Sequence, residues 1–329
     1  MKVLVTGGAG YIGSHVVKQL GEAGHDIVVY DNLSTGYEWA VTCGELVVGD
    51  VGDFDKLDAL FTEHTFEAVL HFAANIVVPE SVENPLKYYG NNTRNTLNLL
   101  SVIQKHQTPY MVFSSTAAVY GMPDEKVLTE DMPLAPINPY GASKMMSEQM
   151  IRDLSFATGL KHVILRYFNV AGADLQSRIG QATPEATHLI KVACECVTGA
   201  RTGMKVFGTD YETRDGTCIR DYIHVDDLAK AHVMALDYMA KGGDSQIMNC
   251  GYGRGFTVKE VIDVVKEKSG VDFSVEETER RAGDPDALMA DNTKIKQTLG
   301  WAPDNDDLGV IVQSALDWEA VWQTRRDGA

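Results

Sequence analysis

The sequence lacks any apolar stretch that could cross a membrane. A spanning helix needs about eighteen consecutive apolar residues, and every apolar run in the chain is much shorter. Its N-terminus also lacks the charged, apolar and small-residue regions of a signal peptide. Met1 and Lys2 lead directly into a short apolar run that is typical of a strand. These absences predict a cytoplasmic protein that does not bind membranes.

Cysteine is scarce, and its five copies show no CxxC spacing. Cys194 and Cys196 would point to different sides of a helix, so reduced structural thiols are the better interpretation. His224, Asp226 and Asp227 are the other candidates for metal ligands, but they lie in an amphipathic strand-to-helix pattern. The sequence therefore predicts no metal site.

Positive charge is in short supply, with 29 Lys and Arg residues against 46 Asp and Glu residues and a net charge of −17. Nucleic acids and anionic membranes need basic surfaces, so both are excluded as partners. A small anionic substrate is not excluded, because a few arginines can bind a diphosphate locally. The 329 residues contain no visible repeats and are enough for about two domains.

A glycine-rich turn between a strand and a helix is the most informative feature that is present. The apolar run 3–6 is followed by Gly7, Gly10 and Gly13 and then by apolar residues at helical spacing. Such glycines let backbone N–H groups approach a pyrophosphate at a helix N-terminus. Asp31 ends the next strand, where a carboxylate binds the adenosine ribose hydroxyls and repels a 2′-phosphate. The pattern predicts a site for NAD rather than NADP.

Strand and helix patterns alternate through the first half of the chain. Further apolar strand runs occupy 46–51, 68–74, 110–116 and 162–169. A helix capped by Asn91, Asn92 and Thr93 is expected to run to about 106. This alternation predicts an α/β fold with a doubly wound parallel Rossmann sheet.

The pattern becomes irregular after residue 169. We predict an NAD-binding Rossmann domain at 1–169, to which a segment near 219–240 returns as strand and helix. Residues 170–329 form a second, smaller α/β domain with short helices at 189–197 and 258–268. This domain is the expected site of substrate binding.

Tyr140 and Lys144 are four residues apart and therefore share one helix face. A tyrosine titrates near pH 10, too high for a base at neutral pH. The Lys144 ammonium, together with an oxidised nicotinamide, is expected to lower the pKa of Tyr140. Thr116, at the end of the preceding strand, could hydrogen-bond the same substrate hydroxyl. These residues predict removal of a proton from an alcohol whose carbon gives hydride to NAD.

Six segments together carry a family resemblance over nearly the whole chain. They are TGGAGYIGSH at 6–15, DNL at 31–33, HFAA at 71–74, SST at 114–116, NPYGASK at 138–144 and RDYIHV at 220–225. The chain resembles the extended short-chain dehydrogenase/reductase family, and within it the UDP-glucose 4-epimerase branch. The resemblance implies an isomerase that oxidises C4 of a UDP-hexose and returns the hydride to the opposite face. It also implies a tightly bound NAD that is not consumed, and a homodimer.

The resemblance assigns roles to individual residues. Tyr140, Lys144 and Thr116 are the implied catalytic residues. The implied cofactor contacts are Gly7, Gly10, Tyr11, Ile12, Gly13, Asp31, Asn32, Asp50, Val51, Phe72, Ala73, Ala74, Asn91, Ser114, Tyr140, Lys144 and Tyr167. The implied UDP-sugar contacts are Thr116, Tyr140, Asn169, Leu189, Phe207, Arg220, Tyr222, Arg281 and Asp284.

One departure and several alternatives remain. Some epimerases have a lysine that touches the nicotinamide ribose where this chain has Ile76. A 4,6-dehydratase is disfavoured because residues 117–119, after Thr116, are Ala, Ala and Val rather than acids. A non-catalytic NAD-binding protein would not need the tyrosine, the lysine and two arginines. Leu288 aligns with a position where bulk limits N-acetylated sugars in the family, so weak activity on UDP-N-acetylhexosamines is expected. UDP-pentoses and UDP-uronates stay open as alternative substrates.

Overall fold

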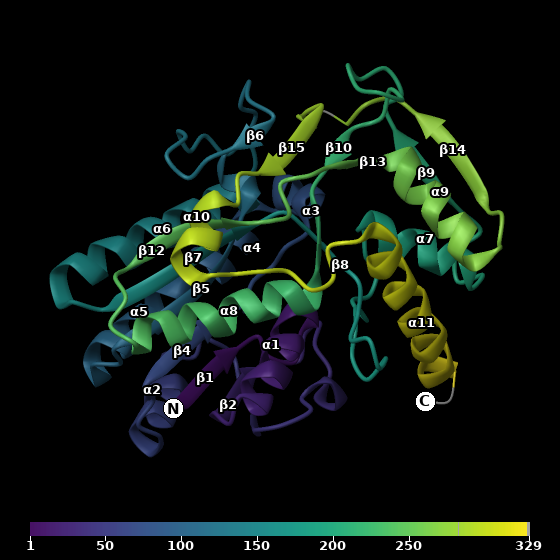
Figure 1. Ribbon diagram of the computed structural model, residues 1–329. Helices are drawn as coiled ribbons and strands as arrows, with labels where there is room; N and C mark the ends of the chain where they lie inside the picture. The colour runs from purple at the N-terminus through teal and green to yellow at the C-terminus, as the bar shows by residue number, and fades with distance from the viewer. Residues whose placement is uncertain (282, 328–329) are drawn as a thin grey trace.

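A seven-stranded parallel sheet forms the centre of the computed structural model, which describes residues 1–281 and 283–327 (Figure 1). The strand order is β12-β7-β5-β4-β1-β2-β3. The strands are β1 (Lys2–Thr6), β2 (Asp26–Asp31), β3 (Glu45–Val48), β4 (Ala68–His71), β5 (Tyr110–Thr116), β7 (Lys161–Tyr167) and β12 (Gln246–Cys250). Every neighbouring pair is parallel, which confirms the predicted doubly wound α/β sheet.

Both faces of this sheet are covered by helices, because successive strand residues point to opposite faces. Val3 and Val5 belong to one buried cluster and Leu4 to the other. The first cluster is covered by α1 (Tyr11–Glu22), α8 (Val225–Ala240) and α10 (Thr293–Leu299). The second is covered by α2 (Phe54–Glu63), α5 (Asn95–His106) and α6 (Pro139–Thr158). The strand ends are thus held between two packed layers.

The segment near 219–240 was predicted to return as strand and helix, and its helix, α8, packs beside α1 (Figure 1). Its strand residues, 219–220 and 222–224, pair outside the main sheet instead. Strand β12, which was not predicted, joins the main sheet, where it pairs with β7. The main sheet and the helices that cover it therefore include more of residues 170–329 than the segment 219–240.

Smaller sheets and three helices make up most of the second half. The short strands are β8 (Asn169–Ala171), β11 (Tyr222–His224), β9 (Gly203–Phe207), β14 (Ser274–Thr278), β6 (Val127–Leu128), β10 (Ile219–Arg220), β13 (Phe256–Thr257) and β15 (Ala287–Ala290). The helices α7 (Leu189–Val197), α9 (Val258–Ser269) and α11 (Leu308–Asp327) share one apolar cluster. The predicted helices at 189–197 and 258–268 are confirmed.

The predicted helix start at residues 91–93 is wrong. Helix α3 (Val78–Glu83) ends before Asn84, and then α4 (Pro85–Tyr88), a π-helical turn (Tyr89–Arg94) and α5 follow one another without a break. No side chain caps either the turn or α5. Pro85, at the first position of α4, starts the helical path earlier than the Asn-Asn-Thr pattern indicated.

Within the described part of the chain, no helix combines the length and the apolar character needed to cross a membrane. Those residues also contain no group of three or more His, Cys, Asp or Glu side chains arranged to hold a metal ion. His224 and Asp227 have other partners. His224 Nε2 pairs with the Ser314 hydroxyl at 3.1 Å, and Asp227 accepts from the Tyr252 hydroxyl at 2.6 Å.

Candidate active site

A cleft of about 1800 Å³ runs along the carboxyl ends of the main-sheet strands. Its volume is larger than that of a typical small-molecule pocket, which is about 300–1,000 Å³. The cleft therefore has room for a dinucleotide and a second nucleotide together. Every residue assigned to a site from the sequence lines this cleft except Ser114 and Lys144. Those two residues lie just outside the lining of the cleft. They contact each other, since Lys144 Nζ donates to the Ser114 carbonyl at 2.9 Å.

The glycine turn lines the cleft. Gly7 has a φ of +73°, and a Cβ added there would lie 2.5 Å from the backbone nitrogen of Ala73. A Cβ at Gly13 would collide with the Gly7 carbonyl. The turn therefore needs glycine at both positions, and helix α1 begins directly after it with its N-terminus toward the cleft. This cradle fits the pyrophosphate of a dinucleotide.

Asp31 is held in place beside this turn. Its carboxylate accepts from the backbone N–H groups of Ala9 at 2.9 Å and Leu33 at 2.8 Å. Burial raises the pKa of Asp31, and these two hydrogen bonds oppose the rise. The side chain lines the cleft, where it can accept hydrogen bonds from ribose hydroxyls.

Asp50 lines the cleft as well. It accepts from the Asn32 amide and the Gly52 N–H, both at 2.7 Å, and from the Asn95 amide at 3.4 Å. Asn95 also lines the cleft, but sequence analysis missed it. Its position one helical turn after Asn91 was the only available signal.

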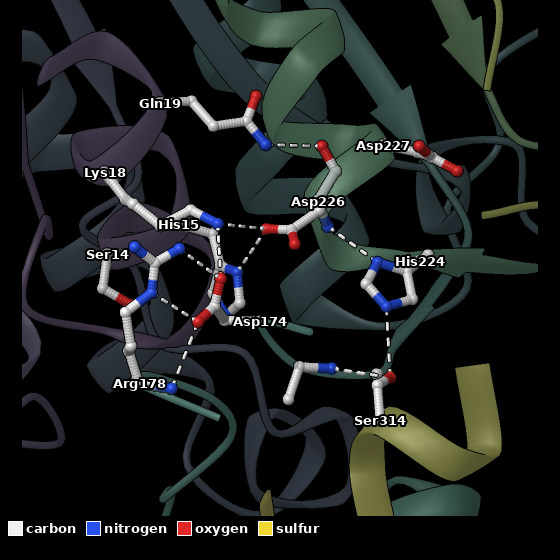
Figure 2. A network of polar contacts seen from close by, with 12 residues as sticks. Ser14, His15, Lys18, Gln19, Asp174, Arg178, His224, Asp226, Asp227 and Ser314 are labelled. Atoms are coloured by element: carbon white, nitrogen blue, oxygen red, sulfur yellow. Dashed lines mark hydrogen bonds and ion pairs between the residues drawn. The ribbon is translucent and has the colours of Figure 1, made fainter. Parts of the chain in front are cut away.

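A buried polar network ties helix α1 to the rest of the molecule (Figure 2). Lys18 Nζ donates to Asp174 at 2.7 Å and to Asp226 at 3.3 Å, and His15 Nδ1 pairs with Asp226 at 2.8 Å. The Arg178 guanidinium bonds both oxygens of Asp174 at 2.7 Å. Burial opposes ionisation of Asp174, but hydrogen bonds from Arg178 and Lys18 outweigh it and hold its pKa well below the usual range.

We expect Asp174→Asn to lower the free energy of unfolding by about 3–5 kcal/mol at pH 7, because two cations lose their buried partner. A lowered folded-state pKa means that this stabilisation is present above the usual carboxyl pKa of 3.8 and is lost as the pH falls below it. Urea unfolding at pH 7 and pH 3 measures both effects. Asp244→Asn, which breaks an exposed pair with Lys161, is the control and should cost less than about 1 kcal/mol. Equal losses in the two variants would contradict this account.

Thr116 and Tyr140 meet at the centre of the cleft. Thr116 ends β5, and Tyr140 is the second residue of α6, whose N-cap Asn138 accepts from the Gly141 N–H at 2.8 Å. Burial raises the pKa of Tyr140 to about 12, and a hydrogen bond with Thr116 opposes the rise. The expected lowering by Lys144 is not found in the chain alone. A further positive charge in the cleft is needed to make the phenolate accessible.

Lys144 is almost fully buried, with 4% of its surface exposed. Burial lowers the pKa of its ammonium to about 8, and the nearby Glu148 carboxylate opposes this. Its Nζ lies 4.8 Å above the Phe113 ring. Ser114, which accepts from Lys144 through its carbonyl, donates through its hydroxyl to Tyr167 at 2.9 Å.

Glu148 is a supporting residue that sequence analysis missed. It accepts from Ser115 Oγ at 2.5 Å, from Arg166 Nε at 3.0 Å and from Arg166 Nη2 at 2.6 Å. These bonds hold β5, which ends at Thr116, and β7 against α6, which carries Lys144. An acidic side chain on the helix face that also carries Lys144 was the available signal.

Arginines line the other half of the cleft. Arg220 forms an ion pair with Asp284, and its Nη1 donates to the Ile219 carbonyl at 2.7 Å. The Arg281 guanidinium lies 3.8 Å from the centre of the Phe207 ring. These positions suit the binding of a diphosphate and a flat base.

Ile76 and a loop at 181–188 also line the cleft. Ile76 is partly exposed at the cleft edge, where it supplies no cation. Gln181 and residues 183–188 were not predicted as lining residues. Their composition gives no local signal, because they reach the cleft only through the packing of the second half.

Comparisons with known proteins agree over the whole chain. A model of the NAD dependent epimerase/dehydratase family matches residues 3–251. A UDP-glucose 4-epimerase of Azospirillum brasilense is 56% identical over 97% of this chain and 92% of that protein. The crystal structure of the Brucella ovis UDP-glucose 4-epimerase with NAD is 44% identical, with a TM-score of 0.94 over 96% of this chain and 97% of the other. The Campylobacter jejuni UDP-Glc/GlcNAc 4-epimerase is 52% identical, with a TM-score of 0.86 over 97% and 99%.

Proposed function

The chain belongs to the NAD dependent epimerase/dehydratase family, and from this premise we propose that it is an NAD-dependent UDP-glucose 4-epimerase. The reaction interconverts UDP-galactose and UDP-glucose. The observation that carries the proposal is the single cleft, which brings Tyr140 and Thr116 together between a dinucleotide cradle and two arginines. A pure NAD-binding protein would not need this set, and a dehydratase would need an acid where residues 117–119 are Ala, Ala and Val.

The residues of the first half fit NAD. The glycine cradle would hold the pyrophosphate, Asp31 the adenosine ribose and Asp50 the adenine side. Tyr167 and Lys144 would support the nicotinamide ribose. The chemistry that NAD supplies when bound is reversible acceptance of hydride from C4 of the hexose.

Tyr140 acts as the base that removes the proton from the C4 hydroxyl, and Thr116 hydrogen-bonds the same oxygen. Arg220 and Arg281 hold the diphosphate, while Phe207 and Leu189 line the base site. Because the nucleotide is held and the hexose is not, the 4-keto sugar can present its other face. With the hydride returned to C4 on that other face, Tyr140 gives the proton back to O4, so C4 is inverted with no net oxidation.

Proton NMR of the purified protein with UDP-galactose and no added NAD tests this function. The anomeric signal of UDP-glucose should grow to equilibrium, because the chain carries its own cofactor. A new C6 methyl signal would instead indicate a dehydratase. No change with any UDP-sugar, even after NAD is added, would contradict enzymatic function.

We expect weak activity on UDP-N-acetylglucosamine, because Leu288 narrows the sugar site. Leu288 pairs with Arg220 in the β10–β15 register and lines the cleft. Leu288→Ala should raise kcat/KM for the N-acetylated sugar about tenfold and change that for UDP-galactose less than twofold. The likeness to the dual-substrate Campylobacter enzyme favours the broader alternative. Equal turnover of both sugars by the unchanged protein would establish it.

We also propose a cytoplasmic homodimer formed through helices α5 and α6. Both helices carry apolar side chains on their outer face, namely Leu97, Met146 and Phe156, the last of which is 95% exposed. Burying these faces against a second copy would remove this apolar surface from water. Sedimentation should give twice the chain mass of 36.0 kDa, and a species of 36.0 kDa alone would contradict the dimer.

A further inference from the structure

Three of the four tryptophans gather in one aromatic cluster, which we define as Tyr37, Trp39, Trp318, Trp322 and Arg325. Trp39 lies 5.3 Å from Tyr37, 5.5 Å from Trp318 and 5.7 Å from Trp322, between ring centres. The Arg325 guanidinium lies 4.9 Å from the ring of Trp39 and 5.2 Å from that of Trp318. The cluster thus joins the chain between β2 and β3 to the C-terminal helix α11.

The first segment held by the cluster lies directly on the dinucleotide cradle. Ser34 and Thr35 line the cleft. Tyr37 N–H donates to the Ala9 carbonyl at 3.1 Å. A Cβ at Gly36 would lie 2.7 Å from the Ala9 backbone. Residues 32–37 therefore cover the turn between Gly7 and Gly10, and they can move away only if Tyr37 and Trp39 move.

The second segment held by the cluster is the loop at 181–188, which lines the same cleft. Trp318 Nε1 donates to the Gln181 carbonyl at 3.1 Å, and the Tyr37 hydroxyl donates to the Ala182 carbonyl at 3.4 Å. A Cβ at Gly180 would lie 2.5 Å from the Trp318 indole. The chain leading into this loop is held by the Asp174 network of Figure 2.

The cluster reaches from a small buried core to the surface. Trp318 is 1% exposed and packs with Ala173 and Ala182, whereas Trp39 is 36% exposed. The fourth tryptophan, Trp301, is buried elsewhere and donates to the Asp227 carbonyl. The cluster contacts neither Tyr140 nor Thr116. It is therefore placed to hold residues 32–37, which cover the dinucleotide cradle, against the loop at 181–188.

We propose that the aromatic cluster holds the two loops closed over the cofactor and so sets how slowly NAD leaves. Trp39 and Trp322 are then positioning residues for cofactor retention. This inference rests on the proposed NAD site and not on the identity of the sugar. Opening the cluster should increase the rate of NAD release and leave the chemical step unchanged, because affinity changes of this kind act mainly on the dissociation rate.

The test compares the unchanged protein with Trp322→Ala, Trp39→Ala, Trp322→Phe and Val310→Ala. Each is loaded with NADH and chased with excess NAD while the NADH fluorescence is followed. Trp322→Ala and Trp39→Ala should each release NADH at least about tenfold faster than the unchanged protein, which corresponds to about 1.4 kcal/mol. Trp322→Phe keeps an aromatic ring, and Val310 lies on the exposed face of α11, so both should stay within twofold. The kcat measured at saturating NAD should stay within twofold in all variants.

Trp39 and Trp322 lie on different segments of the cluster, so either alanine variant still tests the inference if the other does not fold. Unchanged release from a folded Trp39→Ala or Trp322→Ala protein would overturn it. Faster release from Val310→Ala as well would also overturn it, since loosening of α11 would then be the cause. If the unchanged protein binds no dinucleotide at all, the proposed cofactor site fails instead, which keeps the two failures apart.

Discussion

Tyr140→Phe is expected to lower kcat about 10²–10⁴-fold at neutral pH while the protein keeps its NAD and binds UDP-galactose as before. The substitution removes only the hydroxyl that takes the proton from O4. The ring stays buried beside Thr116, so the cleft keeps its shape. Initial rates and the NAD content of the purified variant measure the two parts of this prediction.

Tyr238→Phe is the matched control, because it removes a hydroxyl that lies outside the cleft and accepts from the Asp244 N–H. Its activity should stay within twofold of the unchanged protein. A Tyr140→Phe protein that kept more than about a tenth of the activity would assign the base to another group. Loss of NAD in this variant would show that the hydroxyl serves binding rather than proton transfer.

Lys144→Met is expected to lower kcat about 10²–10³-fold at pH 7, with activity recovering as the pH rises. Burial alone raises the pKa of Tyr140 to about 12, so the phenolate depends on nearby positive charge. Without the ammonium, the phenolate fraction at pH 7 falls and then grows about tenfold per pH unit below that pKa. Profiles of kcat from pH 6 to 10 measure the effect.

Lys230→Met provides the control for this substitution, since Lys230 bonds Asp304 at the surface, away from the cleft. It should leave the pH profile unchanged. The same profile for Lys144→Met and the unchanged protein would show that Lys144 does not assist ionisation of Tyr140. Its hydrogen bond to the Ser114 carbonyl would then be its whole role.

The sequence predicts most of the main sheet and part of the cleft lining, because these features depend on local patterns. The glycine turn, Asp31 and the pair Tyr140 and Lys144 each have a fixed spacing within one strand–turn–helix unit. Strand β12 escaped prediction because its short run does not show which sheet it joins; that depends on pairing with β7. The π-helical turn likewise depends on packing against α6.

Long-range contacts explain what the sequence could not show. Glu148 becomes a supporting residue only because Arg166 on β7 and Ser115 on β5 are brought to it. Trp39 and Trp322 are far apart in sequence, so no spacing rule predicts their cluster. The pKa of Tyr140 shows a further limit, because burial raises it and the only opposing cause is the hydrogen bond with Thr116, not the lysine on which the prediction relied.

The most direct test of the account uses UDP-galactose carrying deuterium at C4, with the purified protein in ordinary water and no added NAD. We predict that the UDP-glucose formed keeps the deuterium at C4, because the hydride that leaves the sugar returns to it within one closed cleft. Loss of the deuterium to water during epimerisation would contradict oxidation at C4. Removal of the C4 hydrogen as a proton would then be the mechanism.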